Sequence, residues 1–288
     1  MMKNYQLLID QWEGSMDINE DTLMDAGVVG AITRINSISG GHHLDDNFRR
    51  NYDQCAVFPV PQVIYFVYNP WKNGKQNFEY LMSVCPASVY CAMIDVEVRY
   101  TGITKAQYAE DVHEFMQLVH GRFAKAFIYT GAWFYSELAY WPDCDYCLAR
   151  YPYVLYPDTA QTWTWEQVRE VIQNDEFTWN PGTPPKLKNG GYLDKSKIKL
   201  WQCSGDRLIL PGTSGKCIDI VLWNGDLESL QAWAGVPEES HIPPPPVVDA
   251  DLAPVYAEIA RLDGDVAAAR QLVGELEGRI ETWKNLPL

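Results

Sequence analysis

The side chains best suited to acid–base chemistry are two carboxylates spaced two residues apart, Asp95 and Glu97. They follow Tyr90-Cys-Ala-Met-Ile94, a run apolar enough for a buried strand, and strand residues two apart point to the same side. Two carboxylates held together in a cleft repel each other, so the pKa of one rises and that group can donate a proton near neutral pH. Other pairs, such as Asp143 and Asp145, share the spacing as solvated charges, and only the buried context distinguishes Asp95 and Glu97.

Two further acids have a similar context in remote parts of the chain. Asp10 ends the apolar run Leu7-Leu8-Ile9, and Asp219 lies within the apolar run 217–222. An acid within or ending an apolar strand is costly to bury unless it is paired or functional. Each acid alone is explained equally well as an ordinary loop residue. Together with Asp95 and Glu97, the two favour one acidic site built from several strand ends.

Aromatic residues lie close to the same strand ends and provide flat surfaces on which sugar rings stack. Those at or near strand ends are Tyr65, Tyr68, Tyr129, Trp12, Trp71, Trp133 and Trp201. Some of them must belong to an ordinary aromatic core. An acidic cleft walled by Tyr and Trp nevertheless predicts a carbohydrate groove.

The elements that must position these residues alternate between apolar strands and helical patterns over the first ~235 residues. The predicted strands are 5–9, 28–35, 61–68, 89–96, 125–129, 146–150, 198–203 and 217–222. Helical patterns cover 19–26, 45–56, 105–120 and 133–139. Because most strands are apolar on both faces, we expect helices on a parallel sheet, closed as an α/β, TIM-like β/α barrel that is irregular in its last third.

An unusually long excursion separates two of the predicted strands, over residues 152–199. It contains one amphipathic helical segment, 165–173, followed by a stretch rich in Pro, Gly and Lys. A connection of that length in a compact domain is usually functional or mobile.

Three regions follow one another along the chain: a barrel over 1–236, a Pro-rich linker over 237–248 and a coiled-coil helix over 249–288. The linker contains four consecutive prolines, 243–246, which form a stiff spacer. From Leu252 to Trp283, apolar residues fall at 3,4 spacing over about five heptads, which predicts self-association as a dimer or trimer. The alternative is an amphipathic helix docked on the barrel.

Composition excludes several classes of function. The net charge of −15 disfavours nucleic acid and simple electrostatic attraction to an anionic membrane or cell wall. No apolar run approaches the ~20 residues of a membrane span, which argues against membrane insertion. The acidic turn at Asp10 comes before any signal-peptide core could develop. Seven cysteines without framework spacing, including Cys144 and Cys147, predict buried thiols rather than disulfides or a metal site.

An ordered series of motifs over residues 5 to 235 resembles glycoside hydrolase family 25, the lysozymes of phage and bacterial type. The matching segments are Leu8-Ile9-Asp10, Asp46-Asn47-Phe48 with Asn51, Ile64 to Pro70, Met93 to Glu97, Ile128 to Gly131, Leu148-Ala149-Arg150-Tyr151, Leu200-Trp201-Gln202 and Gly215 to Asp219. The sequence departs from the family pattern in a shorter loop after Asp10, in Phe66 and Val221, and in its longer excursion.

This resemblance implies a cofactor-independent muramidase that cleaves the β-1,4 bond between N-acetylmuramic acid and N-acetylglucosamine in peptidoglycan. Glu97 would protonate the departing oxygen, and Asp95 would orient the 2-acetamido group or activate water. Asp10 and Asp219 would set the electrostatics. Tyr65 and Tyr129 would contact the saccharide, and we add Tyr68, Arg150, Trp201 and Gln202 as candidate substrate-binding residues.

Two other readings stay open. One is a non-catalytic structural or glycan-binding component on the same barrel, assembled through its coiled coil. The other is hydrolysis of a different N-acetylated glycan. Without a visible signal peptide, we expect synthesis in the cytoplasm and action at the bacterial cell wall, either after lysis or as part of a phage or phage-like particle.

Overall fold

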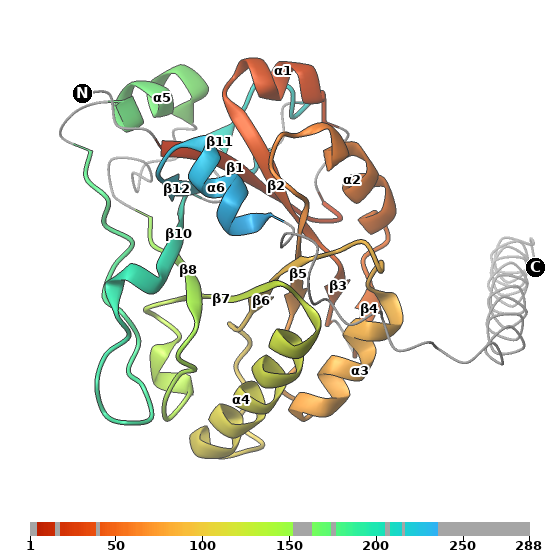
Figure 1. The fold of residues 1–288 in the computed structure, drawn as a ribbon, viewed down its shortest axis with the longest axis vertical. Coiled ribbons are helices and arrows are strands. Elements are labelled where there is room, and N and C mark those ends of the chain that lie inside the picture. Colours follow the sequence, from red (N-terminus) through yellow and green to blue (C-terminus); the bar gives the residue numbers. More distant parts are fainter. Residues whose placement is uncertain are drawn as a thin grey trace, which may run out of the picture. The chain divides into compact units, whose positions relative to one another are not determined.

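A computed structural model describes residues 5–14, 18–38, 41–151, 163–173, 177–204, 208–214 and 217–235. Within them, eight strands close into a barrel in the order β1-β12-β10-β8-β7-β6-β5-β2 (Figure 1). The strands are β1 Tyr5–Gln11, β2 Val28–Arg34, β5 Val63–Val67, β6 Cys91–Asp95, β7 Lys125–Gly131, β8 Asp145–Ala149, β10 Ile198–Ser204 and β12 Asp219–Asn224. The predicted mixed α/β barrel is confirmed, and each predicted strand overlaps one of these.

The last strand runs against the others. β12 pairs antiparallel with both of its neighbours, β1 and β10, whereas the other neighbouring pairs of the barrel are parallel. An antiparallel return needs no crossover helix, which accounts for the irregular last third. As a result, Asp219 at the start of β12 lies opposite Asp10 near the end of β1.

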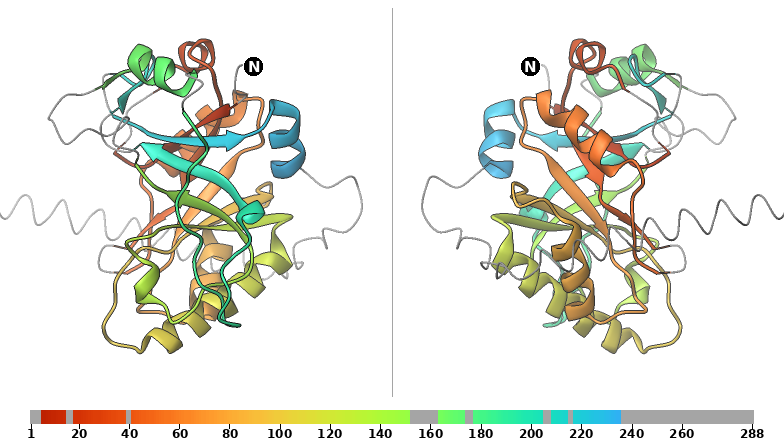
Figure 2. Two further views of the ribbon diagram at one scale, coloured as in Figure 1. Left: turned by 90° about the vertical axis from the view of Figure 1, so that its left-hand side faces the viewer. Right: turned by 90° about the vertical axis from the view of Figure 1, so that its right-hand side faces the viewer.

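Within the described ranges, six α-helices accompany the barrel. They are α1 Glu20–Asp25, α2 Phe48–Gln54, α3 Gly74–Val84, α4 Lys105–Arg122, α5 Trp165–Gln173 and α6 Leu227–Ala234. α3 and α4 lie side by side, with α1 and α5 toward the opposite side of the barrel (Figures 1 and 2). The helices predicted over 19–26, 45–56, 105–120 and 165–173 are confirmed. Helices α3 and α6 were not predicted from the sequence.

The remaining elements are short. They are the 3-10 turns η1 Cys55–Val57, η2 Tyr135–Glu137 and η3 Lys195–Lys197, the pair β3 Asn36–Ser37 with β4 His43–Leu44, and the pair β9 Trp163–Thr164 with β11 Leu208–Ile209. The helix predicted over 133–139 is wrong, because only η2 forms there. The amides of Phe134 and Glu137 bond three residues back, to Gly131 and Phe134, so the chain makes tight turns instead of a helix.

Local sequence explains where α3 and α4 begin. Asn73 and Thr104 form capping boxes with Gln76 and Gln107, so that each pair satisfies amides at the start of its helix. The two helices approach closely at Gly74, where a Cβ atom would lie 2.4 Å from the carbonyl oxygen of Asp111. Only glycine allows this contact.

The core consists of a barrel interior and outer layers, because alternate strand residues face opposite sides. The interior cluster includes Leu8, Tyr65, Met93, Tyr129, Leu200 and Val221. α6 adds Leu230 and Ala234 to this cluster, and the indole nitrogen of Trp233 donates to Asp145 at the start of β8 (2.9 Å). α6 therefore closes the barrel at the end where the parallel strands begin, and leaves the opposite end for a site.

Three predicted features lie wholly or partly outside the described residues. They are the linker over 237–248, the coiled coil from Leu252 to Trp283, and two stretches of the excursion, 152–162 and 174–176. No helix in the described part of the chain is both long and apolar enough to cross a bilayer.

Candidate active site

The four acids predicted from sequence converge at the end of the barrel where the parallel strands finish. Leu8 is part of the barrel interior, so Asp10, two residues on, faces the same side, and Met93 places Asp95 likewise. Asp219 is the register partner of Asp10. Burial raises the pKa of Asp10 well above its usual range, and the charges of Asp219 and Glu97 raise it further. Glu97 and Asp10 also act on Asp95, so the four acids lie close enough to influence one another's charge.

The acids differ in their access to water. Asp10 and Asp95 are buried, whereas Glu97 lies two residues beyond the end of β6 and is exposed. Burial, then the charges of Glu97 and Asp10, raise the pKa of Asp95 well above its usual range. Desolvation by the surrounding protein also raises the pKa of Glu97. The site therefore holds protons at pH values where a surface carboxylate would be ionised, and Glu97 is the acid that a ligand reaches first.

A hydrogen-bond network surrounds the amide of Gln202, which is buried on β10. Its carbonyl oxygen accepts from the hydroxyls of Tyr129 (2.6 Å) and Tyr151 (2.9 Å), and its nitrogen donates to Asp219 (3.0 Å). Because every polar atom of the amide is used, the orientation of Gln202 is fixed, and with it the positions of both tyrosines. The amide thus links β7, β10 and β12 at the open end.

Arg34 supplies positive charge to the site and was not among the residues predicted from the sequence. It ends β2, two residues after Ile32 of the barrel interior, and its charge lowers the pKa of both Asp10 and Asp95 against the larger effect of burial. Tyr65 also hydrogen-bonds to Asp10. Asp10 was identified because it is a charged residue at the end of an apolar run. Arg34 ends the apolar run 28–34 in the same way, so the same criterion applied to cations would have found it.

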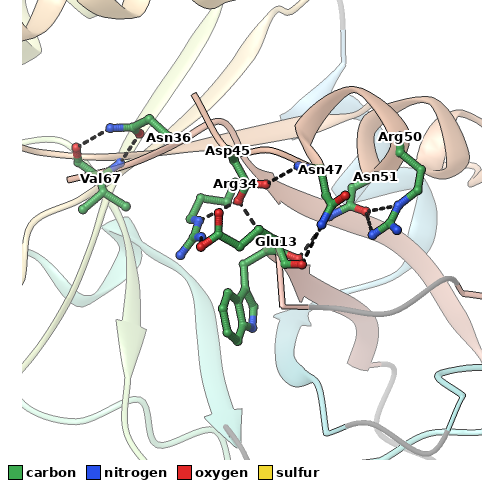
Figure 3. Close-up of polar contacts among 9 residues, drawn as sticks. Glu13, Arg34, Asn36, Asp45, Asn47, Arg50, Asn51 and Val67 are labelled. Atoms are coloured by element: carbon green, nitrogen blue, oxygen red, sulfur yellow. Dashed lines mark hydrogen bonds and ion pairs between the residues drawn. The ribbon is translucent and has the colours of Figure 1, made fainter. Parts of the chain in front are cut away.

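The guanidinium of Arg34 is held in place by loops near the same end of the barrel (Figure 3). Its Nε donates to Asp45 (2.8 Å), its Nη2 pairs with Glu13 (3.1 Å), and its guanidinium lies 5.1 Å from the ring centre of Trp12. Asp45 is fully buried and also accepts the backbone amide of Glu13 (2.9 Å). Because these contacts preorganise the cation, its position beside the acids does not depend on a ligand.

The loop that carries Trp12 is fixed to α2. Asn51, buried in that helix, donates to the carbonyl oxygen of Trp12 (3.1 Å), and Asn47 donates to that of Glu13 (2.8 Å) (Figure 3). The segment 46–51 thereby positions the loop after β1 beside the acidic site.

The predicted sugar contacts divide into two groups. Tyr65, Tyr129 and Gln202 lie at the acidic site, and Arg150 lines a neighbouring cleft. Tyr68 and Trp201 need correction, because both are buried in outer core layers. Tyr68 packs against Tyr108 and Phe115, and Trp201 stacks on Phe177 with ring centres 5.3 Å apart. Tyr68 follows the end of β5, and Trp201 occupies a β10 position that alternates with Gln202, so both point away from the barrel interior.

Three tryptophans named from sequence are exposed on loops that follow barrel strands. Trp12, Trp71 and Trp133 follow β1, β5 and β7, and 43%, 54% and 48% of their surfaces are accessible. Large aromatic side chains with that much exposure are available to stack on a ligand rather than needed by the core.

The arrangement gives no indication of a metal centre. In the part of the chain that the structure describes, no group of three or more His, Cys, Asp and Glu side chains could hold a metal ion. Cysteines 55, 85, 91, 144, 147 and 203 are free thiols, and burial raises the pKa values of thiols such as Cys147 well above the usual range. A buried neutral thiol behaves as a small apolar side chain.

Comparisons with known proteins agree with this geometry. Residues 9–170 match the model of glycosyl hydrolases family 25. A family 25 glycosyl hydrolase from Bacillus anthracis has a TM-score of 0.56 at 15% identity, over 81% of this chain and 94% of that one. A family lysozyme from Aspergillus fumigatus gives 0.56 at 16%, over 81% and 100%. The spore cortex lytic enzyme SleM from Clostridium perfringens gives 0.57 at 19%, over 79% and 69%.

At these identities the structural likeness establishes the fold. A comparison with curated protein sequences gave no match. The family match covers more than half of the chain and includes Asp10, Asp95 and Glu97. The chain therefore belongs to glycosyl hydrolases family 25.

Proposed function

We propose that this barrel is a muramidase that hydrolyses the β-1,4 bond between N-acetylmuramic acid and N-acetylglucosamine in peptidoglycan. Membership of the family makes the chain a hydrolase of glycosidic bonds. The names of its structural neighbours, a lysozyme and a spore cortex lytic enzyme, support peptidoglycan as the substrate. The observation that carries the proposal is the convergence of Asp10, Asp95, Glu97 and Asp219 at the open end of the barrel.

Glu97 is the general acid in this proposal. A general acid must be protonated at the working pH and must reach the departing oxygen. Desolvation raises the pKa of Glu97, and its exposure at the open end makes it accessible to a glycan. Asp95 lies deeper and cannot be reached as easily.

Asp95 orients the substrate. Among the described residues, its Oδ1 atom is buried without a hydrogen-bond partner, which is costly unless a ligand completes the site. An acetamido N–H group, or the attacking water, supplies the donor that this oxygen lacks. Either assignment places Asp95 beside the sugar carbon at which the bond breaks.

Asp10, Asp219 and Arg34 set the field around that pair. The charge of Asp10 raises the pKa of Asp95, and Arg34 opposes it. A cationic transition state, such as that of glycoside hydrolysis, is stabilised by nearby carboxylates. Tyr65 and Tyr129 line the same site and are suited to contact the saccharide.

Product analysis tests the proposed bond. Purified peptidoglycan is digested with the wild-type protein, the new reducing ends are converted to alditols with borohydride, and the alditols are identified. We expect muramitol, since the bond after N-acetylmuramic acid is cleaved. Glucosaminitol would redirect the proposal to another glycosidic bond, and no alditol, with retained binding to the wall, would favour the non-catalytic glycan-binding alternative.

Self-association and attachment to a particle are parts of the proposal that depend on the region after the barrel. The 3,4 spacing from Leu252 to Trp283 supports a dimer or trimer. Light scattering on the full chain and on a chain ending at Pro246 tests this: a monomer in both cases would refute it. Action at the wall after lysis, or from a phage-like particle, stays a proposal by analogy.

A further inference from the structure

A second cleft, of about 690 Å³, lies beside the acidic site. The charged side chains that line this cleft are cationic, whereas the neighbouring site is rich in carboxylates. The residues that matter for its chemistry are Trp133, Arg150, Tyr151, Asn180, Gly182 and Lys195. The volume falls in the range of pockets that hold small ligands, about 300–1,000 Å³.

One wall of the cleft comes from the long excursion, and it is firmly attached to the barrel. Phe177 stacks on Trp201, and the guanidinium of Arg150 donates to the carbonyl oxygen of Asn180 (2.9 Å). Further along, the amide of Trp141 donates to the carbonyl oxygen of Lys186 (2.9 Å). The segment 177–186 is therefore held at both ends, and the cleft between it and the loops after β7 and β8 is part of the fold.

The charge of the cleft is opposite to that of the molecule. Asp and Glu outnumber Lys and Arg by 38 to 23 in the whole chain, yet among the residues that the structure describes the cleft is lined by Arg150 and Lys195 and by no acidic residue. Within the described residues, neither cation forms an ion pair with a carboxylate. Two unpaired cations in a concave site favour an anionic ligand.

Tyr151 connects the cleft to the acidic site. It lines the cleft, while its hydroxyl donates to Gln202, whose amide donates to Asp219. Trp133 lies on the other side of the cleft, with its ring centre 6.3 Å from that of Tyr151. A ligand at the acidic site and a substituent in the cleft would therefore be neighbours.

We propose that this cleft binds the carboxylate-bearing peptide carried by N-acetylmuramic acid, so that the protein prefers peptide-substituted glycan strands. The inference rests on the proposed muramidase function, because it takes the glycan at the acidic site as given. Arg150 and Lys195 pair with peptide carboxylates, and Trp133 and Tyr151 pack on the apolar parts of the chain. In a strand without peptides, each muramic acid carries one free lactyl carboxylate. In a peptide-bearing strand that carboxylate is used in the amide bond to the peptide, and the peptide brings several carboxylates of its own at a greater distance from the sugar.

The test compares two glycans with the same strands, one with its peptides and one from which an amidase has removed them. Lys195→Gln removes a cation of the cleft whose side chain makes none of the contacts described above that attach segment 177–186 to the barrel. Lys188→Gln makes the same change in charge on the same excursion, at a lysine paired with Glu110 outside the cleft (2.8 Å). Dissociation constants are measured by calorimetry in the Glu97→Gln background, and rates of reducing-end release in the active protein.

We expect the parent to bind the peptide-bearing glycan more tightly. Lys195→Gln should lower the ratio of the two affinities by about two- to fivefold, the range for a partly exposed ion pair, and Lys188→Gln should leave the ratio as in the parent. The effect should shrink at high salt. A ratio that Lys195→Gln does not change, or an equal loss on both glycans, would overturn the inference. A preference for the peptide-bearing glycan in binding, without any reducing-end release, would instead refute the muramidase function and leave the proposed peptide-binding role of the cleft intact.

Discussion

Neutralising Asp10 should stabilise the protein at high pH, at the expense of activity. Asp10 and Asp219 are directly opposed in the antiparallel pair β1–β12, which places their Cβ atoms about 4.5–5.5 Å apart. Two like charges about 5 Å apart repel by about 3 kcal/mol at an effective dielectric constant of about 20. Asp10→Asn removes this repulsion and the desolvation of a charge, but it also loses the attraction of Arg34. We therefore expect a gain in unfolding free energy of about 2 kcal/mol at pH 8.

The gain should depend on pH, and the sign follows from the raised pKa. Burial and nearby charges raise the pKa of Asp10 in the folded protein well above the ~3.9 of an unfolded aspartate. The folded state then binds more protons than the unfolded state, so wild-type stability falls as pH rises from about 4 through the folded pKa. At pH 4 the group is largely neutral when folded, and the variant should gain little.

Urea unfolding at pH 4 and pH 8, followed by tryptophan fluorescence, measures this difference. Asp53→Asn is the matched control, because Asp53 is exposed in α2 and its replacement should change stability by less than about 0.5 kcal/mol at either pH. A gain from Asp10→Asn that is equal at both pH values, or a loss at pH 8, would refute the assignment of Asp10 to a repulsive, buried cluster.

Two further substitutions test the hydrogen-bond network of the site and the packing of the outer helices. Gln202→Leu leaves the hydroxyls of Tyr129 and Tyr151 without their acceptor. We therefore expect the free energy of unfolding in urea to fall by about 1–3 kcal/mol and kcat/KM on peptidoglycan to decrease. Unchanged values would contradict the hydrogen-bond network. Gly74→Ala places a Cβ atom 2.4 Å from the carbonyl oxygen of Asp111, so α3 and α4 must move apart. We expect the free energy of unfolding, measured by heat or urea, to fall by about 1–3 kcal/mol while kcat is retained. An unaltered stability would show that the two helices are not in close contact there.

Sequence patterns predicted the barrel well, because strands buried on both faces leave continuous apolar runs. The reversal of β12 could not be predicted in this way: an apolar run carries no information on strand direction, and direction follows from the lack of a crossover helix after β10. Helices α3 and α6 were missed, although the capping residues Asn73 and Gln76 mark the start of α3. The apolar pattern over 133–139 suggested a helix, but Phe134 and Leu138 pack into the outer core from tight turns instead.

At the site, the alternation of side chains along a strand explains which residues were predicted correctly and which were not. Asp10 and Asp95 were found because each follows an apolar run, and they occupy inward positions. Trp201 was expected to bind sugar because of its type and location, yet it alternates with Gln202 and faces the outer core. Side-chain orientation needs the register of the barrel, which sequence did not provide. Arg34 was missed because a charged residue at the end of a buried apolar run had been taken as a signal only when it was an acid.

Glu97 is the proposed acid of a glycan-cleaving site at the open end of the barrel. A comparison of Glu97→Gln with the wild type in reducing-end release from purified peptidoglycan tests this role. Glu79→Gln, a change at an exposed glutamate of α3, is the control and should act as the wild type. We expect Glu97→Gln to lower the rate of release by about 10²–10⁴-fold while the urea midpoint is retained. Equal rates from Glu97→Gln and the wild type would contradict it.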